Sequence, residues 1–147
     1  MQCHELRAQL IRWSAEADGD SGEPLSLVID DGDVTFDKRD GALQLAVELP
    51  ASVSHEAPLE DVLRLAHPSL SRFPGALARS PDDARLWLMA QLPAHGHVDD
   101  LIELLEALLN QRDTWQSMLH KTSRSSAAPV ARRPPHAHFI GTGLRHA

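Results

Sequence analysis

The chain has 147 residues, of which 42% are hydrophobic and 24% are charged, which suffices for one domain with one substantial core. Its single cysteine, Cys3, excludes an intramolecular disulfide framework and a Cys-rich zinc module. No stretch approaches the roughly 18 consecutive apolar residues of a membrane span. The first residues do not form a basic segment followed by an apolar one, so they do not predict a cleaved export signal. We therefore expect a soluble protein.

Charge is unevenly distributed along the chain. The first 121 residues hold ten Lys or Arg against all 21 Asp or Glu, a net charge of −11. The last 26 residues carry four arginines and no acid. The acidic part repels phosphate backbones, which disfavours nucleic acid as a partner.

The first half of the chain predicts a helix followed by a three-stranded meander. Apolar residues spaced as on one helical face predict a helix over 6–17, and the Gly- and Pro-containing segment 18–24 ends it. Apolar and polar residues then alternate with a period of two, which predicts strands joined by tight turns at Gly32 and Gly41. The predicted strands are 25–30, 34–37 and 43–49.

The second half predicts a helix, two strands and a longer helix. Pro58 opens a helix that we expect to end at His67, since a residue that precedes proline avoids the helical region. A short apolar strand follows at 76–78. The segment 86–92 is apolar on both faces, which predicts a central strand covered on each side. The last predicted helix is Leu-rich and ends at about His120.

The order helix, three strands, helix, two strands, helix predicts an α+β fold in which helices pack on an antiparallel sheet. We expect residues 1–121 to form a single domain. Residues 122–147 contain Pro, Ser and Arg without periodicity and predict a flexible basic tail.

Residues that could ligate metals or catalyse reactions are present, but their spacing favours structural roles. The pairs His95 with His97 and His136 with His138 have no Cys or carboxylate at a ligand-like spacing. Adjacent aspartates lie in predicted turns or at a helix start, where Asp stabilises local structure. These pairs are Asp30-Asp31, Asp82-Asp83 and Asp99-Asp100. Cys3 has no evident partner base. We therefore expect no enzyme, no metal and no cofactor.

The sequence contains more apolar side chains than we expect a single domain of this kind to bury. Trp13, Trp87, Trp115 and a largely apolar last helix exceed what one thin sheet and three helices bury. One interpretation is that these residues fill a well-packed monomer. Alternatively, one face forms a homodimer and another receives the chain of a partner, and the predicted helix that starts at Pro58 is short enough to pair symmetrically with its own copy.

Four segments resemble the class I type III secretion chaperones of the CesT/Tir-chaperone family. They are ALQLAVELP at 42–50, LEDVLRLA at 59–66, ARLWLMAQLP at 84–93 and LIELLEALL at 101–109. The likeness covers about residues 5 to 120. It implies an acidic homodimer in the bacterial cytoplasm that binds the N-terminal segment of a secreted effector and keeps it soluble and secretion-competent. The resemblance implies neither nucleotide binding nor membrane insertion.

The resemblance also implies which residues make contacts. The implied dimer contacts are Leu59, Val62, Leu63, Ala66 and Leu70. The implied effector-binding residues, on the first helix and the sheet, are Leu10, Trp13, Leu27, Ile29, Phe36 and Leu88. We expect binding by strand addition, in which a sheet edge supplies backbone hydrogen bonds and apolar pockets select side chains.

Two alternatives stay open at this point. The first is a regulatory or assembly adaptor of the secretion apparatus that binds a folded partner, for example as half of a heterodimer. The second is a small enzyme or ligand-binding domain whose site uses His95, His97 or the Asp pairs.

Overall fold

The computed structural model describes residues 2–16 and 22–126. Nine elements follow each other along the described chain. They are α1 (Cys3–Glu16), β1 (Leu25–Ile29), β2 (Gly32–Arg39), β3 (Ala42–Glu48), η1 (Ser52–Glu56), α2 (Leu59–Ser69), β4 (Ala76–Arg79), β5 (Leu86–Pro93) and α3 (Val98–Ser126). The α+β prediction is confirmed.

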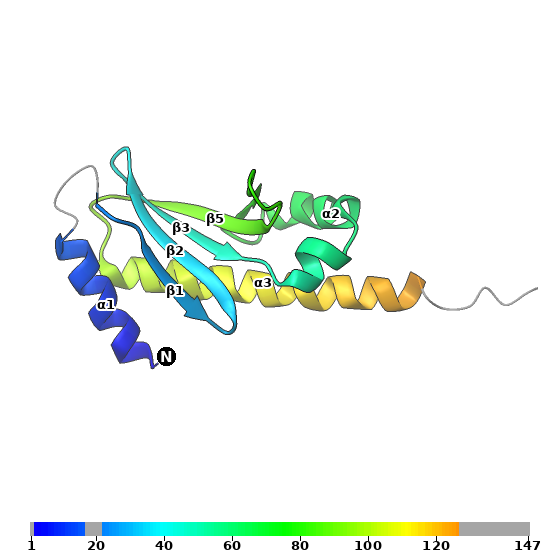
Figure 1. Ribbon diagram of the computed structural model, residues 1–147, viewed down its shortest axis with the longest axis horizontal. Helices are drawn as coiled ribbons and strands as arrows, with labels where there is room; N and C mark the ends of the chain where they lie inside the picture. The colour runs from blue at the N-terminus through cyan, green and yellow to red at the C-terminus, as the bar shows by residue number, and fades with distance from the viewer. Residues whose placement is uncertain (1, 17–21, 127–147) are drawn as a thin grey trace, which may run out of the picture.

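The five strands form one antiparallel sheet in the order β1-β2-β3-β5-β4. Figure 1 shows α3 running along one face of this sheet and extending beyond it, with α1 near the start of α3 and α2 toward its other end. The strands β1 and β4 are therefore the sheet edges, where backbone groups have a strand neighbour on one side only.

The core lies between α3 and one face of the sheet. Strand register places Val34, Val47 and Leu88 side by side on this covered face, and all three are fully buried. Period-two alternation sends the intervening residues to the other face, which no helix covers in the described chain. That outer face carries Ala46 and Met89 in the same register.

The structure corrects the predicted strand 86–92, which is not covered on both sides. The strand β5 buries Leu86 and Leu88 against the helices, whereas Trp87 and Met89 lie on the outer face and are partly exposed. The prediction failed because an apolar run is the same for a strand that is buried on both faces and for a strand that is buried on one face and exposes apolar side chains on the other.

Two helix ends also differ from the prediction. The helix α2 continues through Pro68 to Ser69, whose hydroxyl donates to the Leu65 carbonyl at 2.8 Å and supports the last turn. The helix α3 continues to Ser126, so the predicted boundary between residues 121 and 122 falls inside it. In that extension the Ser123 hydroxyl donates to the Leu119 carbonyl. The predicted tail beyond Ser126 lies outside the described residues.

Candidate partner-binding surfaces

The helix α2 presents an apolar stripe to solvent. Leu59, Leu63 and Leu70 are 44%, 54% and 65% exposed, and Ala66 is half-buried between them. These four residues, which we call the α2 stripe, recur at i, i+4, i+7 and i+11 and so share one side of the helix. Of the five predicted dimer residues, only Val62 lies elsewhere: it points into the core and is fully buried.

A groove lies between α1 and the edge strand β1. It has a volume of about 340 Å³ and is lined by Gln9, Arg12, Trp13, Glu16 and Leu25; we call it the β1 groove. The Trp13 indole N–H donates to the Glu23 carbonyl at 3.0 Å, which ties the segment before β1 to α1. Thus an apolar surface and the free edge of the sheet lie side by side.

Of the predicted effector-binding residues, Trp13 alone lines this groove, and the others pack in or against the core. Trp13 lines the groove, and Leu27 and Ile29 are half-buried in β1. Leu10, Phe36 and Leu88 have no exposed surface, so a partner cannot touch them while this packing persists. Their role as contact residues stays a prediction that would require this packing to open, because alternation along a strand does not identify which side of the sheet is open.

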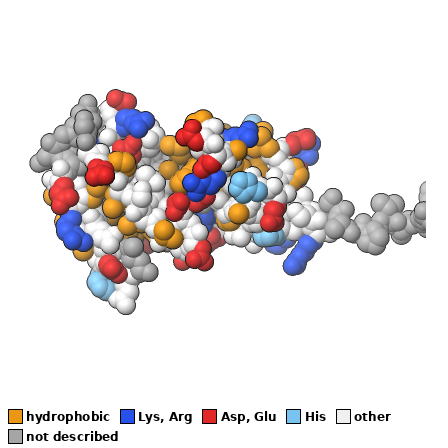
Figure 2. All heavy atoms as spheres, viewed as in Figure 1, with side chains coloured by type: hydrophobic (Ala, Val, Ile, Leu, Met, Phe, Trp, Pro, Cys, Tyr) orange, Lys and Arg blue, Asp and Glu red, His pale blue; other side chains and the backbone are white. Residues whose placement is uncertain are grey.

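A second groove, absent from the prediction, lies on the outer face of the sheet. It has a volume of about 340 Å³, and its apolar lining includes Ala46, Ala78, Trp87 and Met89. The sequence signal that could have predicted this groove is the alternation of Trp87 and Met89 with Leu86 and Leu88, which places the two pairs on opposite faces of the strand. Figure 2 shows hydrophobic side chains at the surface among acidic and basic groups.

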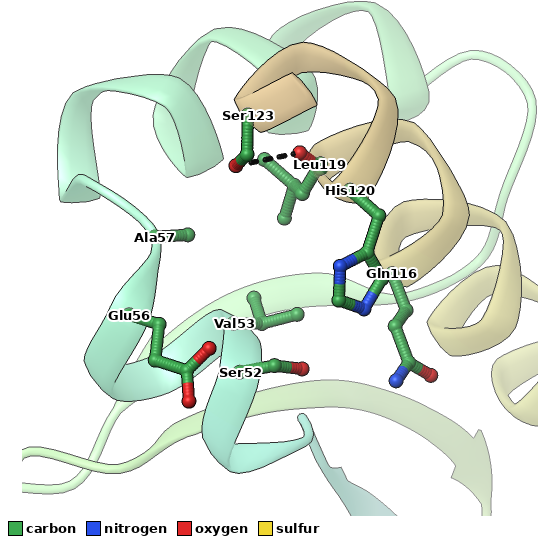
Figure 3. A pocket seen from close by; sticks show the side chains of 8 residues that line it. All are labelled: Ser52, Val53, Glu56, Ala57, Gln116, Leu119, His120 and Ser123. Atoms are coloured by element: carbon green, nitrogen blue, oxygen red, sulfur yellow. Dashed lines mark hydrogen bonds between the residues drawn. The ribbon is translucent and has the colours of Figure 1, made fainter. Parts of the chain in front are cut away.

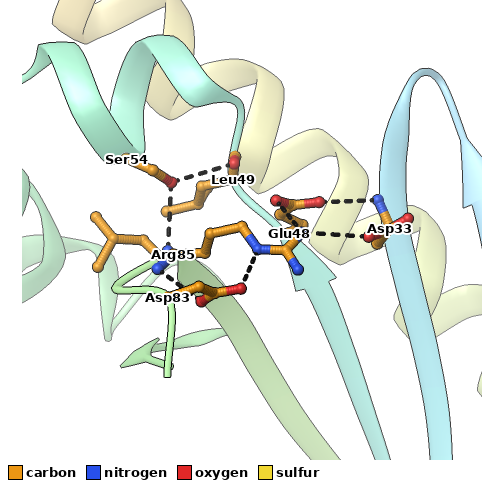
Figure 4. A network of polar contacts seen from close by, with 7 residues as sticks. Asp33, Glu48, Leu49, Ser54, Asp83 and Arg85 are labelled. Carbon is orange, nitrogen blue, oxygen red and sulfur yellow. Dashed lines mark hydrogen bonds and ion pairs between the residues drawn. The ribbon is translucent and has the colours of Figure 1, made fainter. Parts of the chain in front are cut away.

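Arg85 joins three segments at the edge of this outer face (Figure 4). Its Nε lies 2.5 Å from Asp83 Oδ2, and its Nη1 lies 2.9 Å from Glu48 Oε1 and 3.3 Å from Asp33 Oδ2. The guanidinium also stacks over the Trp87 ring, 5.7 Å from its centroid. The hydrogen bond from Arg85 lowers the pKa of Asp83 from 3.8 to about 2, and the same carboxylate raises the pKa of Arg85.

Two of the cavities that border α3 differ in size and lining. The smaller, about 110 Å³, lies between η1 and the last turns of α3 and includes Val53, Leu119 and His120 (Figure 3). The larger, about 430 Å³, is rimmed by acidic residues that include Asp30 and Asp113, both paired with the buried Arg112. Because Arg112 Nη1 also donates to the Ile29 carbonyl at 3.3 Å, this cluster joins the β1-β2 hairpin to α3.

The predicted structural roles of the aspartates agree with their surroundings. Asp30 and Asp31 adopt positive φ in the β1-β2 turn, at 50° and 61°. Asp100 accepts a hydrogen bond from the His97 N–H at 2.9 Å at the start of α3. Within residues 2–16 and 22–126, no three His, Cys, Asp or Glu side chains gather as metal ligands. His136 and His138 lie outside the described residues.

No helix in the described part of the chain is both long and apolar enough to cross a membrane.

The fold is that of the class I type III secretion chaperones, which confirms the resemblance at the level of architecture. A chain in the crystal structure of the ExsC–ExsE complex superposes with a TM-score of 0.57 at 18% identity, covering 81% of this chain and 97% of that one. A chain of the HopA1–SchA chaperone–effector complex gives 0.56 at 18% identity, covering 80% and 98%. A chain of the heterodimeric ExoU–SpcU complex from the type III secretion system of Pseudomonas aeruginosa gives 0.51 at 22% identity, covering 79% and 98%. No protein-family model matches the sequence, and neither does any curated protein.

Proposed function

We propose that this protein is a type III secretion chaperone that binds the N-terminal segment of a secreted effector and keeps it soluble and secretion-competent in the bacterial cytoplasm. The observation that carries the proposal is the shared fold: the chain matches nearly the whole length of chains from complexes that include a chaperone with its effector. The chemistry is non-covalent and uses apolar surface and a free sheet edge.

The β1 groove is the proposed effector site. An extended effector segment would add to the free edge of β1 through backbone hydrogen bonds, while the groove beside Trp13 and Leu25 accepts an apolar side chain. Ordering such a segment costs roughly 2–5 kcal/mol, which burial of its apolar side chains must offset. Gln9 also lines this groove, and its Oε1 is buried without a hydrogen-bond partner in the described structure.

The α2 stripe is the proposed homodimer contact. Its leucines are only partly buried in the single chain, since about half of the surface of each faces water. A two-fold axis beside α2 would bring the stripe against its own copy and bury both. The chaperone would then offer two β1 grooves to one effector chain.

The effector site is tested by capture from the secreting bacterium with the full-length, affinity-tagged protein. Leu25→Asp puts a charge into the β1 groove and should reduce capture of a secreted protein at least tenfold. Ser26→Asp is the matched control, because it adds the same charge to the same strand on the opposite, exposed face. Circular dichroism confirms that both variants are folded.

The captured protein then identifies the mode of binding. Deletion of its N-terminal segment should abolish the complex. Equal capture by both variants would remove the β1 groove from the site, and a complex that survives the deletion would favour an adaptor that binds a folded partner.

A further inference from the structure

Apolar residues lie on two sides of α2. On the inner side Val62 and Ser69 are buried, and Leu65 and Ala66 pack partly against the core, whereas the α2 stripe exposes three leucines. At 100° per residue, the stripe and the buried side are separated by about 80° around the helix axis. A rotation of this size would turn the stripe toward the core and the present inner side toward solvent, and polar contacts made by the inner side alone would oppose it.

Two buried polar contacts from α3 hold the inner side of α2 and the segment after it against the core. In the first, the Trp115 indole N–H donates to the Ser69 hydroxyl at 3.0 Å, and this hydroxyl donates to the Leu65 carbonyl. Trp115 is 1% exposed and Ser69 is 6% exposed. Because Ser69 lies in the last turn of α2, rotation of the helix would strand both polar groups in the core.

The second contact holds the segment that leaves α2. Gln111 is fully buried, and its side-chain amide forms two 2.9 Å hydrogen bonds with the backbone of Gly75, one accepted from the N–H and one donated to the carbonyl. A Cβ on Gly75 would come within 2.5 Å of Gln111 Oε1 and 2.7 Å of the Leu108 side chain, so the approach requires glycine. The connector between α2 and β4 is thereby fixed at both ends.

We propose that Trp115 and Gln111, one helical turn apart on α3, are positioning residues that hold α2 with its stripe outward and thereby permit self-association. The inference rests on the proposed homodimer through the α2 stripe. The two residues touch no partner; they act through Ser69 and Gly75.

A double-mutant cycle on the full chain tests the first contact. Ser69→Ala leaves the indole N–H buried without a partner and should weaken dimerisation about tenfold, as measured by sedimentation equilibrium. Trp115→Phe removes that donor and should have a smaller effect. The double variant should dimerise more tightly than the sum of the two single effects predicts, because no orphaned donor remains.

The rate of amide hydrogen exchange in α2 relative to that in β3 is a readout that general destabilisation changes little, because global unfolding accelerates exchange in both elements. Exchange in α2 should accelerate in Ser69→Ala relative to exchange in β3. The matched control is Val34→Ala, which weakens the sheet core but should leave the dimer dissociation constant within about twofold of wild type. Equal effects of Ser69→Ala and Val34→Ala on dimerisation, or no effect of Ser69→Ala, would overturn the inference.

Failure of the proposed homodimer is a separate outcome. If the wild-type protein is monomeric at every concentration, the dimer proposal fails, and the exchange measurement alone decides whether the contacts orient α2. Unchanged exchange in α2 would then overturn the positioning role as well, whereas selective acceleration would support it.

Discussion

The helices α2 and α3 have the same Leu-rich pattern but opposite relations to the core. The α3 helix buries Leu101, Leu105 and Leu108 against the sheet and packs further apolar residues behind them. The α2 helix leaves Leu59 and Leu63 about half exposed. Leucines at helical spacing therefore indicate an apolar helix surface that packs against another element. The position of the helix on the sheet decides whether that element belongs to this chain or to another.

The sharpest test of the buried side is Leu105→Ala. Leu105 is 1% exposed, so the substitution should lower the free energy of unfolding by about 2–5 kcal/mol through lost burial and a residual cavity. Met118→Ala on the same helix, 47% exposed in wild type, should change it by no more than about 0.5 kcal/mol. Urea denaturation measures both, and equal costs would show that α3 is not the core helix described above.

The exposed side is tested by Leu63→Asp. A carboxylate in an apolar dimer contact is costly to desolvate, so the dimer dissociation constant should rise at least about 100-fold. The fold should survive, because Leu63 is 54% exposed in the single chain. Ile11→Asp is the control: Ile11 is a similarly exposed apolar residue on α1, outside the stripe. Light scattering after size exclusion distinguishes the two, and a Leu63→Asp dimer would exclude the α2 stripe as the contact.

Much of the fold was predictable because periodicity reports local geometry directly. The alternation of Leu43, Leu45 and Val47 with polar residues defines β3 and its covered face. Helix ends were less predictable, since they depend on tertiary contacts. The Ser69 hydroxyl supports α2 beyond Pro68, and it also accepts a hydrogen bond from Trp115, 46 residues further along the chain.

The candidate site was predictable in part, for the same reason. Helical spacing identifies the α2 stripe, and Val62 departs from it only because it faces the core. Spacing alone could not show that Phe36 and Leu88 lie under the helices while Trp87 lies on the outer face. The Arg85 cluster was also hidden, because it joins Asp33, Glu48 and Asp83 from three separate segments.

The smallest expected effect concerns that exposed cluster, where charge rather than apolar burial joins the segments. The pKa of Asp83 is about 2 in the folded protein and 3.8 ordinarily, so ionised Asp83 stabilises the fold fully above pH 3.8 and progressively less as the pH falls toward 2. The stability difference between wild type and Asp83→Asn should therefore be constant from pH 7 to about 5 and shrink between about pH 4 and 2. Urea titrations of both proteins measure this difference, in which the other carboxylates largely cancel. Added salt at pH 7 should also reduce it, since the Asp83 side chain is 40% exposed. A difference that stays the same at pH 7 and pH 2 would show that the ion pair with Arg85 does not stabilise the start of β5.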